Sequence, residues 1–208
     1  MNTYAVRRKR KVKKDKSLNL DRNKTEKKER NRTSNDPLTK EECETLLKGI
    51  DNIQDYTLLF LGLYTGMRVS EIGSIEDISL REDEGKIHIW DEKKNIYRDV
   101  FVPEEVFSGI KRYLNSIKKR KDPRIFPVST KTIERRIQFW TKKILGKQKS
   151  WHTIRHSYIS LSRELYIPME IVIQNTGDTP STILKYYSRP SSEFIRKTVN
   201  ERKIYEGV

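Results

Sequence analysis

Apolar residues recur every three or four positions along much of the chain, which is the spacing of one helix face. Thr39 and Glu42 form a capping-box pattern where the first such segment begins. The next segment, about residues 54–65, is apolar on most sides, which predicts a buried helix that Gly66 ends. A shorter helix is expected over residues 68–75. The same spacing predicts further helices over residues 104–119, 130–145, 151–165, 168–175, 181–188 and 191–203.

Three short segments in the middle of the chain, residues 75–80, 86–90 and 98–103, resemble strands instead. The polar turns "REDEG" and "DEKKNIY" separate them, so a small antiparallel sheet is expected. The sequence therefore predicts an α+β protein that is mainly α-helical, with one three-stranded antiparallel sheet. Its length fits one such domain, which we place at residues 37–208.

Charge is distributed unevenly along the chain. Residues 1–36 hold 14 Lys and Arg against 5 Asp and Glu, with little apolar content and no periodicity, and we interpret them as a disordered basic arm that contacts DNA. The alternative is a solubilising tail. The whole chain has a formal net charge of +15, so a polyanion is its natural partner.

The composition also excludes several classes of protein. The longest apolar run, near residues 58–64, is far shorter than the roughly 20 residues that cross a bilayer. We expect no secretory signal, because the charged N-terminus lacks an apolar segment. Cys43 is the only cysteine, which excludes an intramolecular disulfide and a cysteine metal cluster.

Two polar pairs stand where core packing does not explain them. Arg68 and Glu71 are three residues apart after a strongly apolar run, and they form either a structural ion pair or part of a site. His152 and Arg155 have the same spacing near a helix start, where they can bind an anion; the alternative is a capped surface helix. His156 is expected to point elsewhere and to be structural. No Cys or carboxylate stands at ligand spacing from these histidines, so no metal site is expected.

Two adjacent lysines and two adjacent tyrosines complete the candidates. Lys93 and Lys94 stand at the tip of the expected hairpin, where lysines usually serve solubility, but a lysine within reach of a reacting oxygen is a proton donor. Tyr186 and Tyr187 lie in "LKYYS", where tyrosines usually pack. A tyrosine hydroxyl held among arginines, a histidine and a lysine can instead attack a phosphodiester.

Together, four stretches resemble the tyrosine recombinase, or phage integrase, family. "LYTGMRVSEIGSIEDISL" resembles the first arginine box of the family, and "KIHIWDEKKNIYRDVFVP" resembles its lysine-bearing hairpin. "WHTIRHSYIS" resembles the His-x-x-Arg box, and "QNTGDTPSTILKYYS" resembles the closing box that ends in the nucleophilic tyrosine. The stretches stand in the order of the family and cover about residues 38–200, which implies the fold of its catalytic domain.

The resemblance implies a role for each candidate. Arg68 and Arg155 would bind the scissile phosphate, and Glu71 would hold Arg68. His152 would donate to a non-bridging oxygen or assist proton transfer. The usual spacing of the family favours Lys94 over the lysine before it as the acid that protonates the leaving 5′-oxygen.

The closing box aligns without gaps from Gly177 onto Tyr187, which would be the nucleophile; Tyr186 is the second choice. Attack on DNA would give a 3′-phosphotyrosine link and a free 5′-hydroxyl, with no metal and no other cofactor. The resemblance thus implies a site-specific recombinase of the integrase or invertase type, in which four protomers join two double-stranded DNA sites. Its source would be a mobile genetic element, a virus or a host, and its place the cytoplasm, at the nucleoid, or the host cytoplasm for a virus.

Two departures from the family pattern leave alternatives open. Where the family has His or Trp after the glycine of the closing box, this chain has Asp178, and an ionised carboxylate cannot donate to a phosphate and would repel it. Either Asp178 is rotated away, or activity is reduced, or a residue such as Lys185 supplies the donor. Residues 1–36 are also too short and too polar for the N-terminal helical domain of the family. The alternatives are a non-catalytic DNA-binding protein on a degenerate recombinase scaffold, or strand nicking and closing like that of type IB topoisomerases.

Overall fold

The computed structural model describes residues 36–187, 196 and 200, all within the unit Ser34–Val208. The basic arm and the helix predicted over residues 191–203 therefore lie outside the described residues, except for Asp36, Arg196 and Asn200. In chain order the elements are α2 (Lys40–Gly49), α3 (Ile53–Thr65), α4 (Val69–Ser74), η1 (Asp77–Ser79), β1 (Leu80–Arg81), η2 (Glu82–Glu84), β2 (Lys86–Asp91), β3 (Ile96–Phe101), α5 (Glu104–Ser116), α6 (Thr130–Leu145), α7 (Trp151–Glu164), α8 (Met169–Thr176) and α9 (Pro180–Tyr187).

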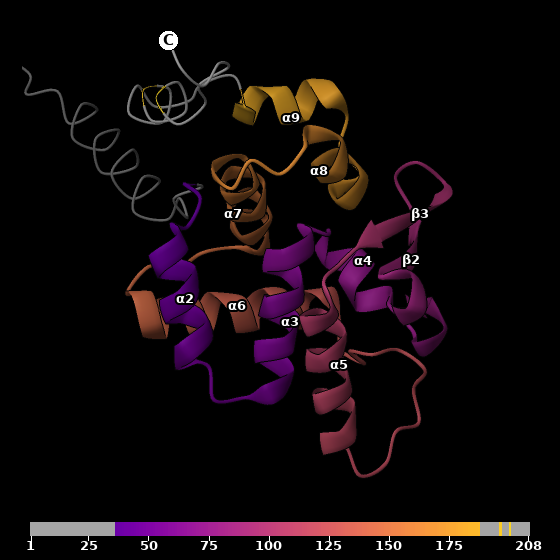
Figure 1. Ribbon diagram of the computed structural model, residues 1–208. Coiled ribbons are helices and arrows are strands. Elements are labelled where there is room, and N and C mark those ends of the chain that lie inside the picture. Colours follow the sequence, from indigo (N-terminus) through magenta and orange to yellow (C-terminus); the bar gives the residue numbers. More distant parts are fainter. Residues whose placement is uncertain (1–35, 188–195, 197–199, 201–208) are drawn as a thin grey trace, which may run out of the picture. The chain divides into compact units, whose positions relative to one another are not determined.

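The predicted fold class is confirmed, because the described residues are mainly helical with one three-stranded antiparallel sheet in the order β1-β2-β3 (Figure 1). The strand predicted over residues 75–80 is wrong for most of its length. Residues 77–79 form the 3-10 turn η1, which is closed by a hydrogen bond from the Glu76 N–H to Ser79 Oγ. Ile75 accepts from the Ile125 N–H at 2.7 Å, so it is fixed to a distant loop and not to the sheet.

The helix boundaries follow the local signals in the sequence. The capping box of α2 is present, with the Glu42 N–H donating to Thr39 Oγ1 and the Thr39 N–H donating to Glu42 Oε2. Helix α3 ends at Gly66, which adopts the left-handed conformation with φ 60°. Any side chain there would also collide with the ring of Tyr158, so this turn requires glycine.

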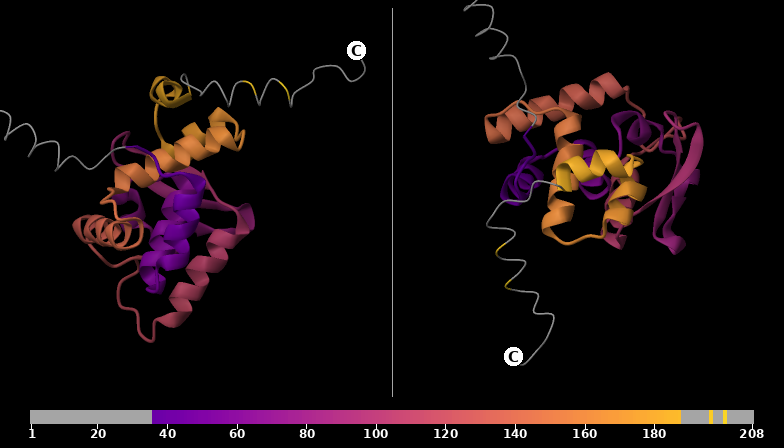
Figure 2. Two further views of the ribbon diagram at one scale, coloured as in Figure 1. Left: turned by 90° about the vertical axis from the view of Figure 1, so that its left-hand side faces the viewer. Right: turned by 90° about the horizontal axis from the view of Figure 1, so that it is seen from above.

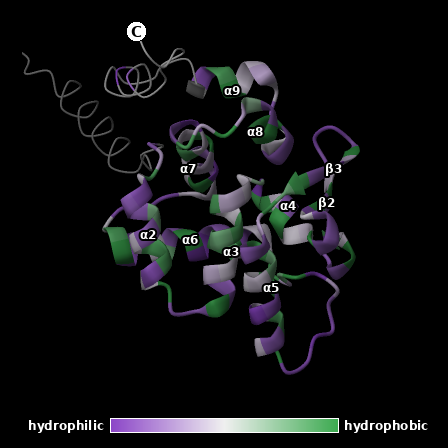
Figure 3. Ribbon diagram, viewed as in Figure 1, coloured by the Kyte–Doolittle hydropathy of each residue, from purple (hydrophilic) through white to green (hydrophobic). Residues whose placement is uncertain are grey.

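Helix α3 lies at the centre of the main hydrophobic core and packs against α2, α5, α6 and α7 (Figures 1 and 2). Hydrophobic and hydrophilic residues alternate along α2, α5 and α6, as expected for helices with one buried face (Figure 3). Gly62 allows a close approach of α3 to the Trp151 ring of α7. The Trp151 Nε1–H also donates to Met67 O at 2.8 Å, which fixes the start of α7 beside the turn after α3.

A smaller apolar cluster joins α7, α8 and α9 and consists of Tyr158, Ile159, Val172 and Ile183. Asn175 attaches α8 to the sheet, because its side chain accepts from the Phe101 N–H at 2.8 Å and donates to Phe101 O at 2.9 Å. These contacts bring the end of α8 to β3. None of the described helices has the length and apolar content to span a bilayer.

Candidate active site

Arg68 is the N-cap residue of α4, directly after the glycine turn that ends α3. Its N–H donates to Glu71 Oε2 at 2.7 Å, and its Nη1 donates to Glu71 Oε1 at 2.9 Å. The predicted i, i+3 pair therefore exists, and Glu71, which is only 3% exposed, fixes both ends of Arg68. Burial opposes the charge on Arg68, but the neighbouring carboxylates outweigh it and raise its pKa.

Arg155 extends from α7 toward the same turn. Its Nη1 donates to Gly66 O at 2.6 Å and its Nη2 donates to Thr176 O at 2.8 Å, so the guanidinium group bridges the ends of α3 and α8. The side chain is only 6% exposed, and this burial lowers its pKa although Asp178 favours the charged form. The two predicted phosphate-binding arginines thus lie close together in the fold.

A third arginine, Arg98 of β3, also belongs to this cluster and is not among the residues predicted for the site. Its Nη1 donates to Gln174 O at 2.9 Å and to Asn175 O at 2.7 Å. Its Nη2 lies 2.9 Å from Glu71 Oε2 as an ion pair. The alternation of the strand could have indicated that Arg98 is buried, because it falls on the same face as the buried Val100.

The C-terminal end of α8 is where the three arginines meet. The last carbonyl groups of a helix lack partners within it and carry partial negative charge. Here the four carbonyl oxygens of residues 174–177 all accept from arginines: two from Arg98, one from Arg155 and, at 3.4 Å, Gly177 O from Arg68. The α8 end therefore orients all three guanidinium groups.

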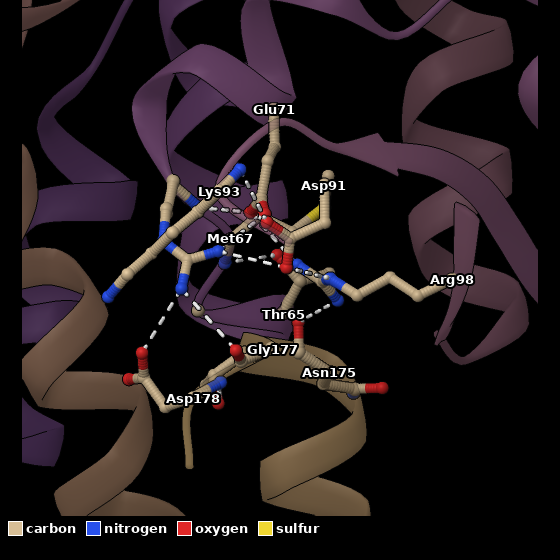
Figure 4. Close-up of polar contacts among 12 residues, drawn as sticks. Thr65, Met67, Glu71, Asp91, Lys93, Arg98, Asn175, Gly177 and Asp178 are labelled. Atoms are coloured by element: carbon tan, nitrogen blue, oxygen red, sulfur yellow. Dashed lines mark hydrogen bonds and ion pairs between the residues drawn. The ribbon is translucent and has the colours of Figure 1, made fainter. Parts of the chain in front are cut away.

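Asp91, the last residue of β2, connects the lysine hairpin to this cluster (Figure 4). Its Oδ2 lies 3.3 Å from Arg68 Nη1 and 3.6 Å from Arg98 Nε. Its Oδ1 accepts from the N–H groups of Lys93 and Lys94 at 3.1 and 3.3 Å. Burial opposes ionisation of Asp91, but the charge of Arg68 and the other partners outweigh it, so its pKa is lowered and it stays a carboxylate.

Asp178 is not rotated away from the site (Figure 4). Its Oδ1 lies 3.2 Å from Arg68 Nη2, and its Oδ2 lies 2.7 Å from Arg155 Nη2. One carboxylate therefore bridges the two arginines that were predicted to bind phosphate. Lys185, suggested as a substitute donor, does not line the cleft around them.

The cleft beside the two arginines is lined by the candidate residues Lys93 and His152 and also by Asp178. Lys93 lines it and Lys94 does not, so the geometry favours the lysine that the family spacing ranked second. The expectation that His156 points elsewhere is wrong. It lines the same cleft, because residues four apart share a helix face, and its ring centroid lies 4.0 Å from that of His152.

The predicted nucleophile is the last residue of α9, and this helix follows the Asp178 loop directly. The side chains of Tyr186 and Tyr187 lie outside the described parts of the chain. Helix α9 packs on α7 and α8 through Ile183, and it begins two residues after Asp178, which contacts both arginines. Within residues 36–187, no group of three or more His, Cys, Asp and Glu could hold a metal ion.

Comparisons with known proteins identify the family of the chain. The family model described as the phage integrase family matches residues 36–192. The tyrosine recombinase XerA of Pyrococcus furiosus is 25% identical over 184 residues, which cover 82% of this chain and 63% of that protein. The tyrosine recombinase XerD of Staphylococcus saprophyticus is 29% identical over 167 residues, covering 74% and 56%. The chain thus spans less than two thirds of the length of these relatives.

Solved structures show the same fold at low sequence identity. A crystal structure of XerA recombinase superposes with a TM-score of 0.69 at 21% identity, covering 82% of this chain and 66% of that chain. The integrase of the Tn1549 transposon, in complex with transposon right end DNA, superposes with a TM-score of 0.65 at 16% identity, covering 80% and 66%.

Proposed function

Because the chain belongs to the phage integrase family, we propose that it is a site-specific DNA recombinase that breaks and rejoins strands through a 3′-phosphotyrosine link to Tyr187. The observation that carries the proposal is the convergence of Arg68 and Arg155 on one anion, the Asp178 carboxylate, at 3.2 and 2.7 Å. Two guanidinium groups held in this way are suited to the charge that develops on a phosphodiester under attack.

In the proposed reaction the Tyr187 oxygen attacks phosphorus, and the bond from phosphorus to the 5′-oxygen breaks. The tyrosine gives up its proton to a base, for which His152 is the candidate, and the leaving 5′-oxygen takes one from a lysine of the hairpin. We assign this role first to Lys93, which lines the cleft, and second to Lys94, which the family spacing favours. The two arginines would stabilise the phosphorane, and His152 would donate to a non-bridging oxygen.

We further propose double-stranded DNA as the substrate, with four protomers on two sites and a mobile genetic element as the source. Several relatives support the choice of DNA. Solved structures of similar fold include XerH recombinase bound to its difH substrate and a lambda integrase dimer bound to a core site. The formal charge of +15 favours the same partner. A protein with this substrate would act in the cytoplasm, at the nucleoid.

The test is a suicide duplex that is nicked close to the cleavage point, incubated with the chain and analysed on a denaturing gel. The wild type should give an SDS-resistant protein–DNA band that Tyr187→Phe abolishes and that the matched Tyr186→Phe retains. If Tyr186→Phe abolishes the band instead, the nucleophile is misassigned. Arg68→Ala should lose the band and keep most duplex binding, because dispersed phosphate contacts supply most of the affinity.

A paired substitution separates the two lysines. Lys93→Ala should slow formation of the covalent band at least tenfold, and Lys94→Ala should change it much less, since general acid catalysis contributes about 10²–10⁴-fold. A duplex with a 5′-bridging sulfur, whose leaving group needs no proton, should restore the rate of the variant that lacks the acid. The opposite pattern would assign the role to Lys94.

One observation favours a second candidate function. The Asp178 carboxylate lies where a phosphate would bind, so the fold could serve as a non-catalytic DNA-binding protein. In that case duplex binding would be retained, and no covalent band would form with any nicked duplex.

A further inference from the structure

We infer that Asp178 competes with the DNA phosphate for Arg68 and Arg155, and that this anion site opens only when the Asp178 side chain leaves it. The inference rests on the proposed function in one respect, which is the identification of the competing anion as a DNA phosphate. The geometry itself does not depend on it. Each carboxylate oxygen of Asp178 is within 3.2 Å of a different guanidinium group, as two oxygens of a bound phosphate would be.

The charge of the cluster supports this assignment. Three arginines, Arg68, Arg98 and Arg155, contact three carboxylates, those of Glu71, Asp91 and Asp178. Within these ion pairs the charges balance, so a further anion would enter without a net attraction from them. Removal of the Asp178 carboxylate leaves one uncompensated positive charge, which matches the single negative charge of a phosphodiester.

Of the three carboxylates, Asp178 is the one that can leave. Glu71 and Asp91 are 3% and 1% exposed, and each also accepts main-chain N–H groups. Asp178 is 16% exposed and lines the cleft, so its carboxylate can turn toward water. Its departure would break two ion pairs, but the carboxylate would regain hydration in the cleft, which offsets part of that loss.

The position of Asp178 in the chain connects this departure to the nucleophile. It stands in the short loop between α8 and α9, after Gly177 with φ 66°. The end of α8 is held by the arginines and by Asn175, so the loop at residue 178 begins from a fixed point. Helix α9 ends at Tyr187. The bridge from Asp178 thus holds the loop that precedes the attacking residue as well as closing the anion site.

The test measures binding of inorganic phosphate to the full chain by isothermal titration, with NaCl adjusted to constant ionic strength. Asp178→Asn keeps the side-chain volume and removes the charge, and it should bind phosphate at least tenfold more tightly than the wild type. The matched control is Asp83→Asn, an exposed aspartate of η2, which should bind phosphate like the wild type. The double variant Arg155→Gln with Asp178→Asn should lose this increase in phosphate affinity, which would show that the phosphate binds at the arginine pair.

Equal phosphate affinity in the wild type and Asp178→Asn would overturn the inference, because a carboxylate that competes for the arginines must weaken the binding of phosphate. If Asp178→Asn does not fold, Asp178→Ser is used in the same titration, after circular dichroism has shown a native spectrum. Phosphate binding is independent of DNA cleavage. A chain that forms no covalent band with nicked duplexes, but binds phosphate more tightly without Asp178, would reject the recombinase proposal and retain this inference.

Discussion

Replacement of Glu71 by glutamine tests whether charge holds the arginine cluster together. Both oxygens of this carboxylate are engaged: Oε1 with Arg68 Nη1 at 2.9 Å, and Oε2 with the Arg68 N–H at 2.7 Å and with Arg98 Nη2 at 2.9 Å. Glutamine fills the same volume but carries no charge. It also places an NH₂ donor where one of these groups donates now, so one contact becomes donor against donor.

The expected loss of stability can be estimated from the burial of the pair. Removal of one partner of a buried ion pair costs about 3–5 kcal/mol, because the other charge stays buried. Asp91 remains 3.3 Å from Arg68 and 3.6 Å from Arg98 and compensates them in part, which places Glu71→Gln at the lower end. A loss of about 3 kcal/mol lowers the melting temperature by roughly 6–12 °C in a protein of this size.

The measurement is urea unfolding of the full chain followed by circular dichroism, with calorimetry for the melting temperature. The matched control is Glu164→Gln, an exposed glutamate of α7, which should stay within about 0.5 kcal/mol of the wild type. The midpoint for Glu71→Gln should fall while the urea dependence is unchanged. A stability within about 0.5 kcal/mol of the wild type would show that Glu71 contributes geometry but little energy, and the reasoning on charge balance would fail with it.

Three further outcomes are expected. Gly62→Ala should destabilise the chain by about 1–2 kcal/mol in urea unfolding, because the new Cβ would lie 2.7 Å from the Trp151 ring, which outweighs the better helix propensity of alanine. Asp55→Asn should cost about 1–3 kcal/mol, measured the same way, since the buried carboxylate accepts from Arg136 Nη1 at 2.9 Å. Burial, with positive charge nearby, lowers the pKa of His156 from 6.5 to about 4. The unfolded chain therefore binds the proton first, stability falls as the pH drops from about 6.5 to 4, and His156→Gln should show a shallower fall in unfolding midpoints over that range.

Much of the fold could be predicted from local patterns. The helix over residues 130–145 was predicted to its observed limits, because its apolar face is continuous and Gly146 stops it. The segment at residues 75–80 misled the prediction, since its apolar residues serve separate contacts: Ile75 is in the core, and Ile78 is exposed. Alternation alone does not show whether a neighbouring strand exists.

The candidate site was predictable only in part. The pair of Arg68 and Glu71 follows from helix spacing, which is a local property. The bridge from Asp178 to both arginines depends on where α8 ends in space, and no periodicity contains this information. The choice between the two lysines was not predictable for a similar reason. Asp91 sets the conformation of the turn, because its side chain and its carbonyl oxygen both accept main-chain N–H groups. The number of residues along the hairpin therefore does not show which lysine faces the cleft.

The hydrogen bonds from three arginines to the carbonyl oxygens at the end of α8 also affect which residues of the site can differ between related chains. Every residue type supplies a main-chain oxygen, so residue 174 or 176 can be exchanged without loss of the acceptor. The arginines, in contrast, have no such freedom. Patterns of correlated substitution should therefore miss this junction entirely, although it fixes the guanidinium groups, and coordinates are needed to find its counterpart elsewhere.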